Sequence, residues 1–206
     1  TGRKNLIESF TAGKSNKGIL ITSDDPITAY YEVNPSNNRD IFALKGDNAL
    51  GTEFFVPAQD KYNNHSGFTY PARNRIDIVA AEDGTVVTFE ITADANGQAA
   101  GSTITSPVLN KGETFSVVAD DPAAGNHLTG THITTNGGLI AVTLSDDSVD
   151  DASVSGWDLL GEQIVPIQAQ DGELLIGEQY IVIRTDLNIN DFYFILATED
   201  FTEIKV

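Results

Sequence analysis

The chain lacks cysteine and methionine altogether among its 206 residues, and basic residues are scarce. Without cysteine, a disulfide framework, a thiolate metal site and a cysteine nucleophile are all excluded. Lysine and arginine total 12 against 30 aspartates and glutamates, which gives a formal net charge of −18. Because this charge repels phosphate backbones and anionic lipids, we expect no nucleic-acid partner and no membrane insertion.

Long apolar runs and helical periodicity are also missing. No stretch approaches the 18 residues of a membrane span, and Thr1 is not followed by the charged and apolar regions of an export signal, so export is expected to be directed by sequence outside this chain. Short β-branched and aromatic runs with period-2 alternation dominate instead. They predict strands at residues 19–22, 27–33, 40–44, 52–57, 75–81, 85–91, 102–109, 113–119, 131–134, 139–144, 163–167, 178–184, 192–198 and 202–206.

Tight turns join most of these predicted strands. Glycine, asparagine and aspartate recur at the turns 82–84, 110–112 and 136–138, where hairpins require a positive φ. The sequence therefore predicts an all-β, antiparallel and hairpin-rich fold. Packed β-sandwich units are the favoured architecture, and four-stranded β-propeller-like blades are the alternative.

The chain also resembles itself. Residues 21–30 return at 133–142, residues 51–56 at 177–182, and residues 78–83 at 195–200, always in the same order. The offset changes from 112 to 126 to 117, as expected if insertions lie in polar loops such as 62–70 and 145–156. We therefore predict a tandem repeat, with a first repeat region at 1–120 that starts inside a repeat and a second, truncated region at 121–206.

Six motifs in a fixed order resemble the N-terminal domain of the IgG Fc-binding protein family. They are NKGILITSDDPI at 16–27, LGTEFFVP at 50–57, IVAAEDGTVVT at 78–88, LNKGETF at 109–115, LTGTHI at 128–133 and WDLLGEQIVP at 157–166. The resemblance implies a secreted or cell-surface module of a large extracellular protein. Where animal members have cysteines, this chain has an acidic run, which favours a bacterial member of the Bacteroidetes kind and does not carry immunoglobulin binding over to this chain.

Two acidic segments are candidate calcium sites, because hard cations prefer oxygen ligands. The first has the D-x-N-x-N spacing of a calcium loop, with Asp186, Asn188 and Asn190. The glycine and the acid that an EF-hand requires are replaced by Asp191 and Ala197, so any calcium loop here is of another kind. The second is a cluster of four carboxylates, Asp146, Asp147, Asp150 and Asp151. Calcium is the one cofactor that the sequence suggests.

The histidines give no catalytic pattern. His65, His127 and His132 lie in or beside predicted loops, without helical zinc spacing or a serine elbow, so no catalytic residue is assigned. Asn64 begins a formal glycosylation sequon. We expect the aromatic residues of the predicted strands to be core residues rather than a ligand platform: Tyr30, Tyr31, Phe54, Phe55, Trp157, Tyr180 and Phe194.

Two classes of function remain. The first is a non-catalytic binding, adhesion or structural module whose surface binds a glycan, a protein or neighbouring subunits. Its ligand would bind the polar insertions, including Asn63, Asn64, His65 and Ser66. The second is a carbohydrate-active enzyme, which would need two carboxylates facing each other across a cleft. The absence of a distinctive His, Cys or Ser constellation favours the binding module.

Overall fold

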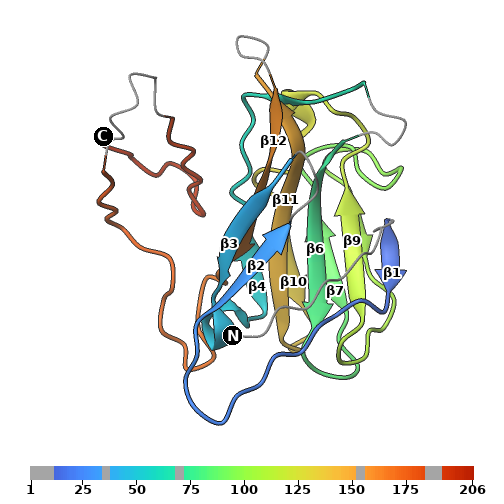
Figure 1. Cartoon of the computed structure of the whole chain (residues 1–206), viewed down its shortest axis with the longest axis vertical. Helices are drawn as coiled ribbons and strands as arrows, with labels where there is room; N and C mark the ends of the chain where they lie inside the picture. The colour runs from blue at the N-terminus through green and yellow to red at the C-terminus, as the bar shows by residue number, and fades with distance from the viewer. Residues whose placement is uncertain (1–11, 34–37, 68–71, 152–155, 184–191) are drawn as a thin grey trace.

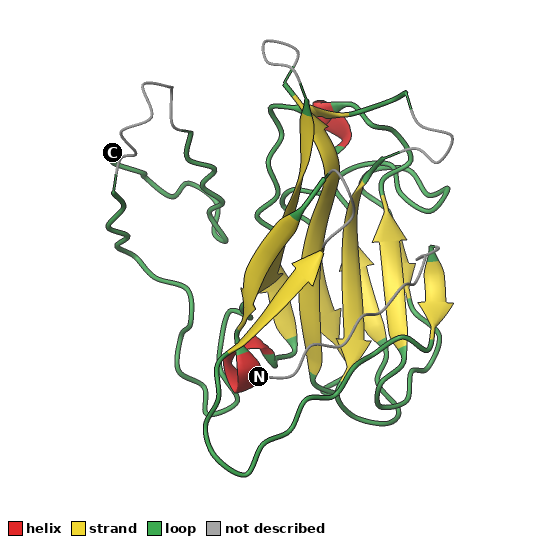
Figure 2. Ribbon diagram, in the orientation of Figure 1, coloured by secondary structure: helices red, strands yellow, loops and turns green. Residues whose placement is uncertain are grey.

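A computed structural model describes residues 12–33, 38–67, 72–151, 156–183 and 192–206. These residues form antiparallel strands and two short 3-10 turns, η1 (Gly46–Ala49) and η2 (Ala124–Asn126), as Figures 1 and 2 show. No helix in this part of the chain has the length and hydropathy needed to cross a membrane. The all-β antiparallel prediction is confirmed.

Two sheets and one hairpin make up the fold. The larger sheet has the order β1 (Gly13–Ser15), β9 (Thr114–Val118), β6 (Asn74–Ala80), β11 (Ile140–Asp150) and β12 (Trp157–Ile164), and β5 (Asn63–Asn64) also pairs with β11. The smaller sheet has the order β4 (Glu53–Phe55), β10 (His132–Thr135), β7 (Val87–Glu90) and β8 (Thr103–Thr105). The hairpin consists of β2 (Ala29–Val33) and β3 (Asp40–Leu44).

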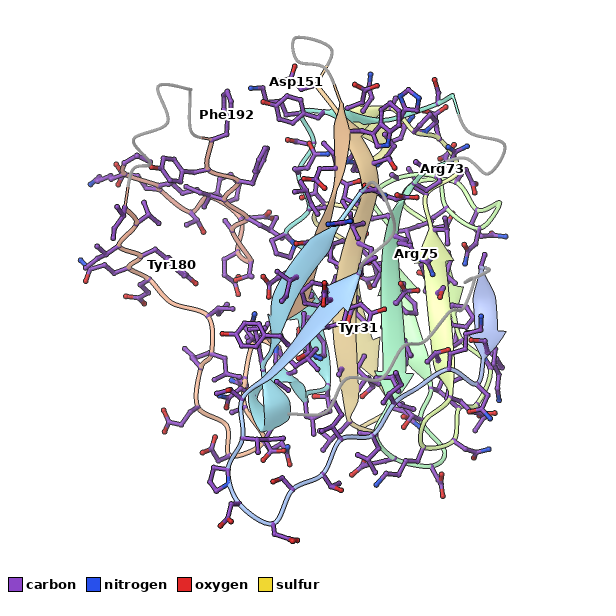
Figure 3. All side chains as sticks on the ribbon, in the orientation of Figure 1. Tyr31, Arg73, Arg75, Asp151, Tyr180 and Phe192 are labelled. Carbon is purple, nitrogen blue, oxygen red and sulfur yellow. The ribbon has the colours of Figure 1, made fainter. Side chains whose placement is uncertain are left out.

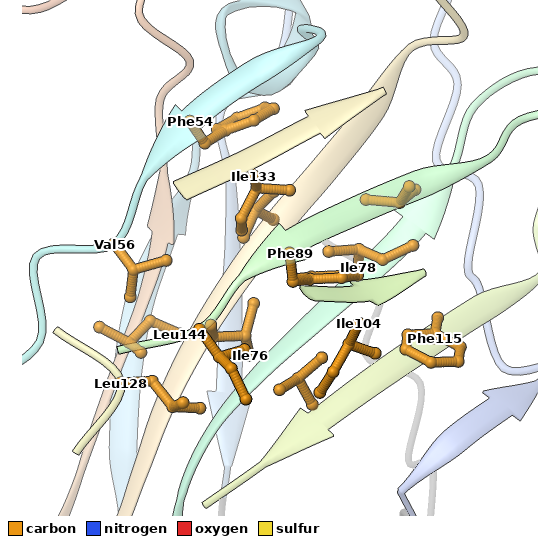
Figure 4. Close-up of a cluster of buried hydrophobic side chains, with 14 of the residues drawn as sticks. Phe54, Val56, Ile76, Ile78, Phe89, Ile104, Phe115, Leu128, Ile133 and Leu144 are labelled. Carbon is orange, nitrogen blue, oxygen red and sulfur yellow. The ribbon is translucent and has the colours of Figure 1, made fainter. Parts of the chain in front are cut away.

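The hydrophobic core lies between the two sheets. In β6, the buried residues Ile76 and Ile78 alternate with the partly exposed Arg75 and Asp77, as a strand with one face in a core requires. Figure 4 shows these isoleucines among buried side chains of both sheets, such as Phe89 of β7. This arrangement is consistent with the predicted sandwich.

The β2–β3 hairpin packs beside β12. The amide of Gly161 donates to the Asp40 carboxylate over 2.5 Å, and the Lys45 amide donates to Gln163 Oε1 over 2.6 Å. A Cβ atom at Gly161 would lie 2.6 Å from Cε1 of Phe42. The hairpin can therefore approach β12 closely only because residue 161 has no side chain.

Most predicted strands form, but four do not. The prediction for 40–44 matches β3, and β6, β7 and β9 lie within one residue or two of their predicted bounds. Residues 19–22, 178–183, 192–198 and 202–206 have strand-like sequences and yet form no strand. Among the aromatics, Phe54 is in the core as expected, whereas Tyr30, Tyr31, Tyr180 and Phe194 are exposed because the hairpin and the C-terminal residues lie outside the sandwich.

The predicted superposition of the repeat segments is wrong. Residues 133–142 belong to β10 and β11, whereas residues 21–28 form no strand; residues 78–80 belong to β6, whereas residues 195–200 form none. Strands from both sides of residue 120 also pair within the same sheets, as β4 does with β10 and β6 with β11. Residue 120 is therefore not a boundary between two separately packed units.

Candidate binding site at the loop end of the sandwich

One end of the sandwich combines polar loops with the ends of two strands, and we call it the loop end. It consists of the loop residues 57–67 and 120–130, the end of β11 with residue 151 (146–151), and the start of β12 with residue 156 (156–158). The opposite end, the turn end, consists of the short connections 81–84, 110–112 and 136–139. The strand pair β5–β11 joins the two polar insertions that the sequence places more than 80 residues apart, with Asn64 opposite Val149 and Asn63 opposite Asp150.

A buried carboxylate lies beneath the loop end. Asp146 follows the buried Ile140, Val142 and Leu144 along the inward side of β11, and it is only 2% exposed. Its two oxygens accept hydrogen bonds from Asn64 Nδ2 at 2.7 Å and from Gln59 Nε2 at 2.6 Å. The carboxylate thus fixes one side chain from each of two neighbouring parts of the loop.

Gln59 and His127 complete this buried network. Gln59 Oε1 accepts hydrogen bonds from the amides of Lys61 and Tyr62, which closes the turn at 59–62. His127 Nδ1 lies 2.8 Å from the Gln59 carbonyl oxygen, so this nitrogen carries the proton and donates to it. The same nitrogen is 3.5 Å from Asp146. These hydrogen bonds hold the backbone at Gln59 and Asn64 against β11, although Asn64 Oδ1 and His127 Nε2 are buried without a hydrogen-bond partner.

A histidine and a tryptophan stack above the network. The His65 and Trp157 rings lie 4.2 Å apart with an interplanar angle of 21°, and His65 Nδ1 is 2.8 Å from Asp150 Oδ2. Both residues are half-buried. Trp157 therefore lies at the surface of the loop end, where the sequence predicted a core residue.

Asn63 and Asp121 hold the neighbouring loop. Asn63 Oδ1 accepts a hydrogen bond from the Ala124 amide at 2.8 Å. The Ala123 amide and the Asn126 side chain donate to Asp121, with Arg73 nearby, and together they hold the pKa of that carboxyl below its ordinary value. Of the four residues predicted for ligand binding, Asn63 and Ser66 are exposed, His65 is half-buried and Asn64 is buried. Since Asn64 Nδ2 is bonded to Asp146 and to the Asp147 carbonyl, the sequon is inaccessible in the folded protein.

The predicted acidic cluster does not converge on one point. Asp146 faces the core, Asp147 accepts from Asn38 Nδ2 at 2.6 Å, and Asp150 faces His65. A bulge between Asp146 and Val149 turns the successive side chains in different directions. Figure 3 shows Asp151 at the tip of β11. Within the described ranges, no three acidic or histidine side chains are placed to hold one metal ion. The other candidates, Asp186, Asn188 and Asn190, lie outside the described residues, and calcium binding stays a prediction.

Each histidine is paired with a carboxylate rather than with a nucleophile. His127 lies near Asp146, His65 near Asp150, and His132 between Glu53 and Glu90 on the outer face of the smaller sheet. His132 also stacks on Phe55, with ring centroids 4.4 Å apart. None of these pairs includes a hydroxyl or thiol that acyl transfer would require.

Sequence reasoning located the loop at residues 62–67, but it placed another at 145–156, where residues 145–150 continue β11. It also missed two of the residues that fix the loop end. Gln59 was not singled out, and His127 was treated only as a residue near a loop. The sequence did contain one signal for this network. Asp146 follows Ile140, Val142 and Leu144 in a period-2 alternation, so its carboxylate is expected to be buried and to need buried hydrogen-bond donors.

Comparison with known proteins identifies one family. The family model described as IgGFc binding protein matches residues 41–206. Neither the curated proteins nor the solved structures contain a match to the chain.

Proposed function

Because the chain belongs to the IgGFc binding protein family, we propose that it is an extracellular, non-catalytic module that binds a protein or glycan through its loop end. The family match supports this proposal. The position of the ligand site rests on the structure of the loop end.

One observation carries the proposal. Two polar segments distant in sequence meet through the β5–β11 pair, above a network that fixes their backbone. A preorganised loop loses little conformational entropy on binding, and loops on rigid scaffolds are the usual place of recognition. The network thus supports recognition rather than merely closing the core.

Carboxylate and amide groups give this surface its chemistry. Asn63, Ser66 and Asp121 are exposed there, and His65 and Trp157 add an aromatic stack. Such groups suit hydroxyl-rich glycans and basic or polar protein surfaces. An immunoglobulin Fc fragment is one protein ligand to test, since the family is named for it.

A pair of matched histidine variants tests the proposal. We would screen the purified chain against a glycan array and an immobilised Fc fragment, and then measure the affinity of His65→Ala and His132→Ala for any ligand found. Each substitution removes a half-exposed ring that is stacked on an aromatic residue and paired with a carboxylate. Of these two histidines, only His65 lies at the loop end.

We expect His65→Ala to weaken binding about tenfold or more and His132→Ala to leave it unchanged. Equal losses in both variants would contradict the assignment of the loop end. Hydrolysis of a glycan in the same screen, abolished by replacing one Asp or Glu, would instead establish the carbohydrate-active enzyme.

A further inference from the structure

Two segments of the chain expose apolar side chains that other proteins bury in strands. The first comprises residues 19–31, and the second comprises residues 177–183 and 192–206. In the second, Tyr180 and Phe192 lie to one side of the sandwich in Figure 3. The family match extends through these C-terminal residues. Exposed apolar surface of this extent indicates a missing partner.

The C-terminal segment reproduces a turn of the folded sandwich. Between β6 and β7, Thr85 Oγ1 donates to the Glu82 carbonyl at 2.9 Å, and Gly84 has a φ of 77°. In the C-terminal segment, Thr202 Oγ1 donates to the Glu199 carbonyl at 2.7 Å, and Phe201 has a φ of 62°. A positive φ is costly for an aromatic residue, so the local sequence specifies this turn even without glycine. Residues 192–206 therefore have the connection of a β6–β7 arch without its flanking strands.

The N-terminal segment reproduces another connection. Residues 21–30 align with residues 133–142 at an offset of 112. At this offset the bend at Asp24 and Asp25 corresponds to the bend at Asn136 and Gly137 between β10 and β11. The first segment therefore corresponds to β10 and the start of β11. In the folded sandwich, β10 lies between β4 and β7, and β11 pairs with β6. The two exposed segments thus correspond in sequence to strands that pair with one another in the sandwich.

Core positions of the sandwich correspond to exposed apolar residues in the segments. Ile133, Phe54 and Phe89 are neighbours in register across β10, β4 and β7, and each is 0% exposed. Their counterparts are Ile21, Tyr180 and Val206, which are 54%, 73% and 105% exposed. Surface positions keep their polarity as well, because Thr134, Glu53 and Thr88 correspond to Thr22, Gln179 and Lys205. The alternation is that of strands with one buried face.

The two segments are held at opposite ends of one sandwich. The first is fixed at the turn end, where the Gly18 amide donates to the Gly112 carbonyl over 3.0 Å. The second contacts the loop end, where the Phe192 ring lies edge-on to Tyr62 and beneath Lys61 Nζ. Figure 1 shows the N-terminal segment beneath the sheets and the C-terminal segment rising beside them. Within one chain, the segments would meet only if one of them left its anchor.

We propose that the C-terminal segment of one copy pairs with residues 19–31 of a second copy, forming a composite sandwich at their junction. The register of the folded sandwich sets the pairing: Ile21 opposite Tyr180 and Val206, and Ala29 opposite Leu196. The Leu139 amide donates to Glu82 Oε2 at 3.1 Å in the sandwich, and its counterpart is an Ile27 amide donating to Glu199. Such strand addition supplies backbone partners to residues 19–28 and to the described C-terminal residues, which form no strand, and it adds a neighbour to β2, which already pairs with β3. The contact is head-to-tail, so it continues from copy to copy.

Association of the whole chain is tested with Ile21→Asp and Tyr180→Asp. The wild type should show a mass that increases with concentration in light scattering, and each variant should associate at least about tenfold more weakly, because each buries a charge in the junction. Val108→Asp is the matched control, since Val108 is 57% exposed, close to the 54% of Ile21, and lies outside both segments. An equimolar mixture of the two variants should form a heterodimer and nothing larger, because one intact junction remains. A wild type that stays monomeric at all concentrations would overturn the proposal.

Engineered cysteines distinguish a second copy from pairing within one chain. The cysteine-free sequence permits Thr22→Cys and Gln179→Cys in the same molecule, at positions opposite each other in the proposed register. We expect a ladder of disulfide-linked oligomers on a non-reducing gel. A control with Thr22→Cys and Thr103→Cys should stay monomeric. An internal disulfide in the first variant, with the chain still monomeric, would show pairing within one chain and would contradict the second copy.

Discussion

Asp146 shows at the residue scale how one side chain can close a core and organise a surface. It occupies the inward side of β11 after Ile140, Val142 and Leu144, and it receives amide donors from Gln59 and Asn64. The sequence displayed this aspartate as part of an acidic cluster. It could not show which donors face it, because both come from residues more than 80 positions earlier in the chain.

Replacing this carboxylate should destabilise the protein. In Asp146→Ala, the buried side-chain amides of Gln59 and Asn64 each lose one acceptor and keep only a backbone carbonyl, so we expect the free energy of unfolding to fall by about 1–3 kcal/mol. Urea denaturation measures the change, with Asp25→Ala in an exposed bend as control, expected within about 0.5 kcal/mol of the wild type. Equal values for the two variants would show that the network contributes nothing to stability.

Most strands could be predicted from the sequence because their pattern is local. β3, β6 and β9 follow from period-2 alternation between turn residues. The same alternation predicts strands at 178–184 and 192–198, where the described residues form none. Strand formation requires a neighbour as well as a pattern, and a sequence read alone does not say whether the neighbour is present.

The packing of the β2–β3 hairpin depends on one glycine. Gly161→Ala would place a methyl group 2.6 Å from Phe42 Cε1, so we expect the hairpin to shift away from β12 and the free energy of unfolding to fall by about 1–3 kcal/mol. Hydrogen exchange should accelerate in β2 and β3 while β6 stays protected. At Gly125, no atom lies within 4 Å of an added Cβ, so Gly125→Ala should leave exchange in the hairpin unchanged.

The short edge strand β1 carries a pH dependence. Lys14 lies 2.7 Å from Glu113, and hydrogen bonds from Lys14 and from the Asn110 amide hold the pKa of Glu113 below its ordinary value. A carboxyl with a lowered folded-state pKa favours the folded state above its unfolded pKa of about 4.3. This stabilisation is lost as the pH falls from about 5 through the folded-state pKa.

Lys14→Met should therefore flatten the acid side of the stability curve. In the variant the folded-state pKa of Glu113 rises toward its ordinary value, so the difference in stability from the wild type should be present at pH 6 and should shrink toward pH 3. Chemical denaturation at several pH values measures this. Parallel curves for the two proteins would contradict the role of the Lys14 pair.

At the scale of the whole molecule, the sequence correctly indicated an all-β sandwich and the family, but it overestimated the number of folded units. The motifs identify a family because they depend on residue order alone. The number of packed units depends on which strands pair with each other. β4 pairs with β10 and β6 pairs with β11, so both pairs cross the predicted boundary at residue 120.

Whether the protein binds calcium can be tested by heat denaturation of the whole chain. If the ion binds, heat denaturation in excess calcium should occur a few degrees above that in EDTA, because a ligand that binds the folded state stabilises it. The variants Asp147→Asn and Asp186→Asn then separate the two candidate sites, since only the variant at the true site should lose the shift. Coincident wild-type curves would remove calcium from the account.

The order of strands in the larger sheet has a mechanical consequence. Tension applied through the two ends of the chain reaches this sheet at β1 on one edge and at β12 on the other. β1 is held by three residue pairs to β9, whereas seven pairs join β12 to β11. We therefore expect β1 to detach first under tension, which lengthens the unfolded N-terminal part of the chain. The β5–β11–β12 region, with its loops, stays folded at forces that have already extended the chain.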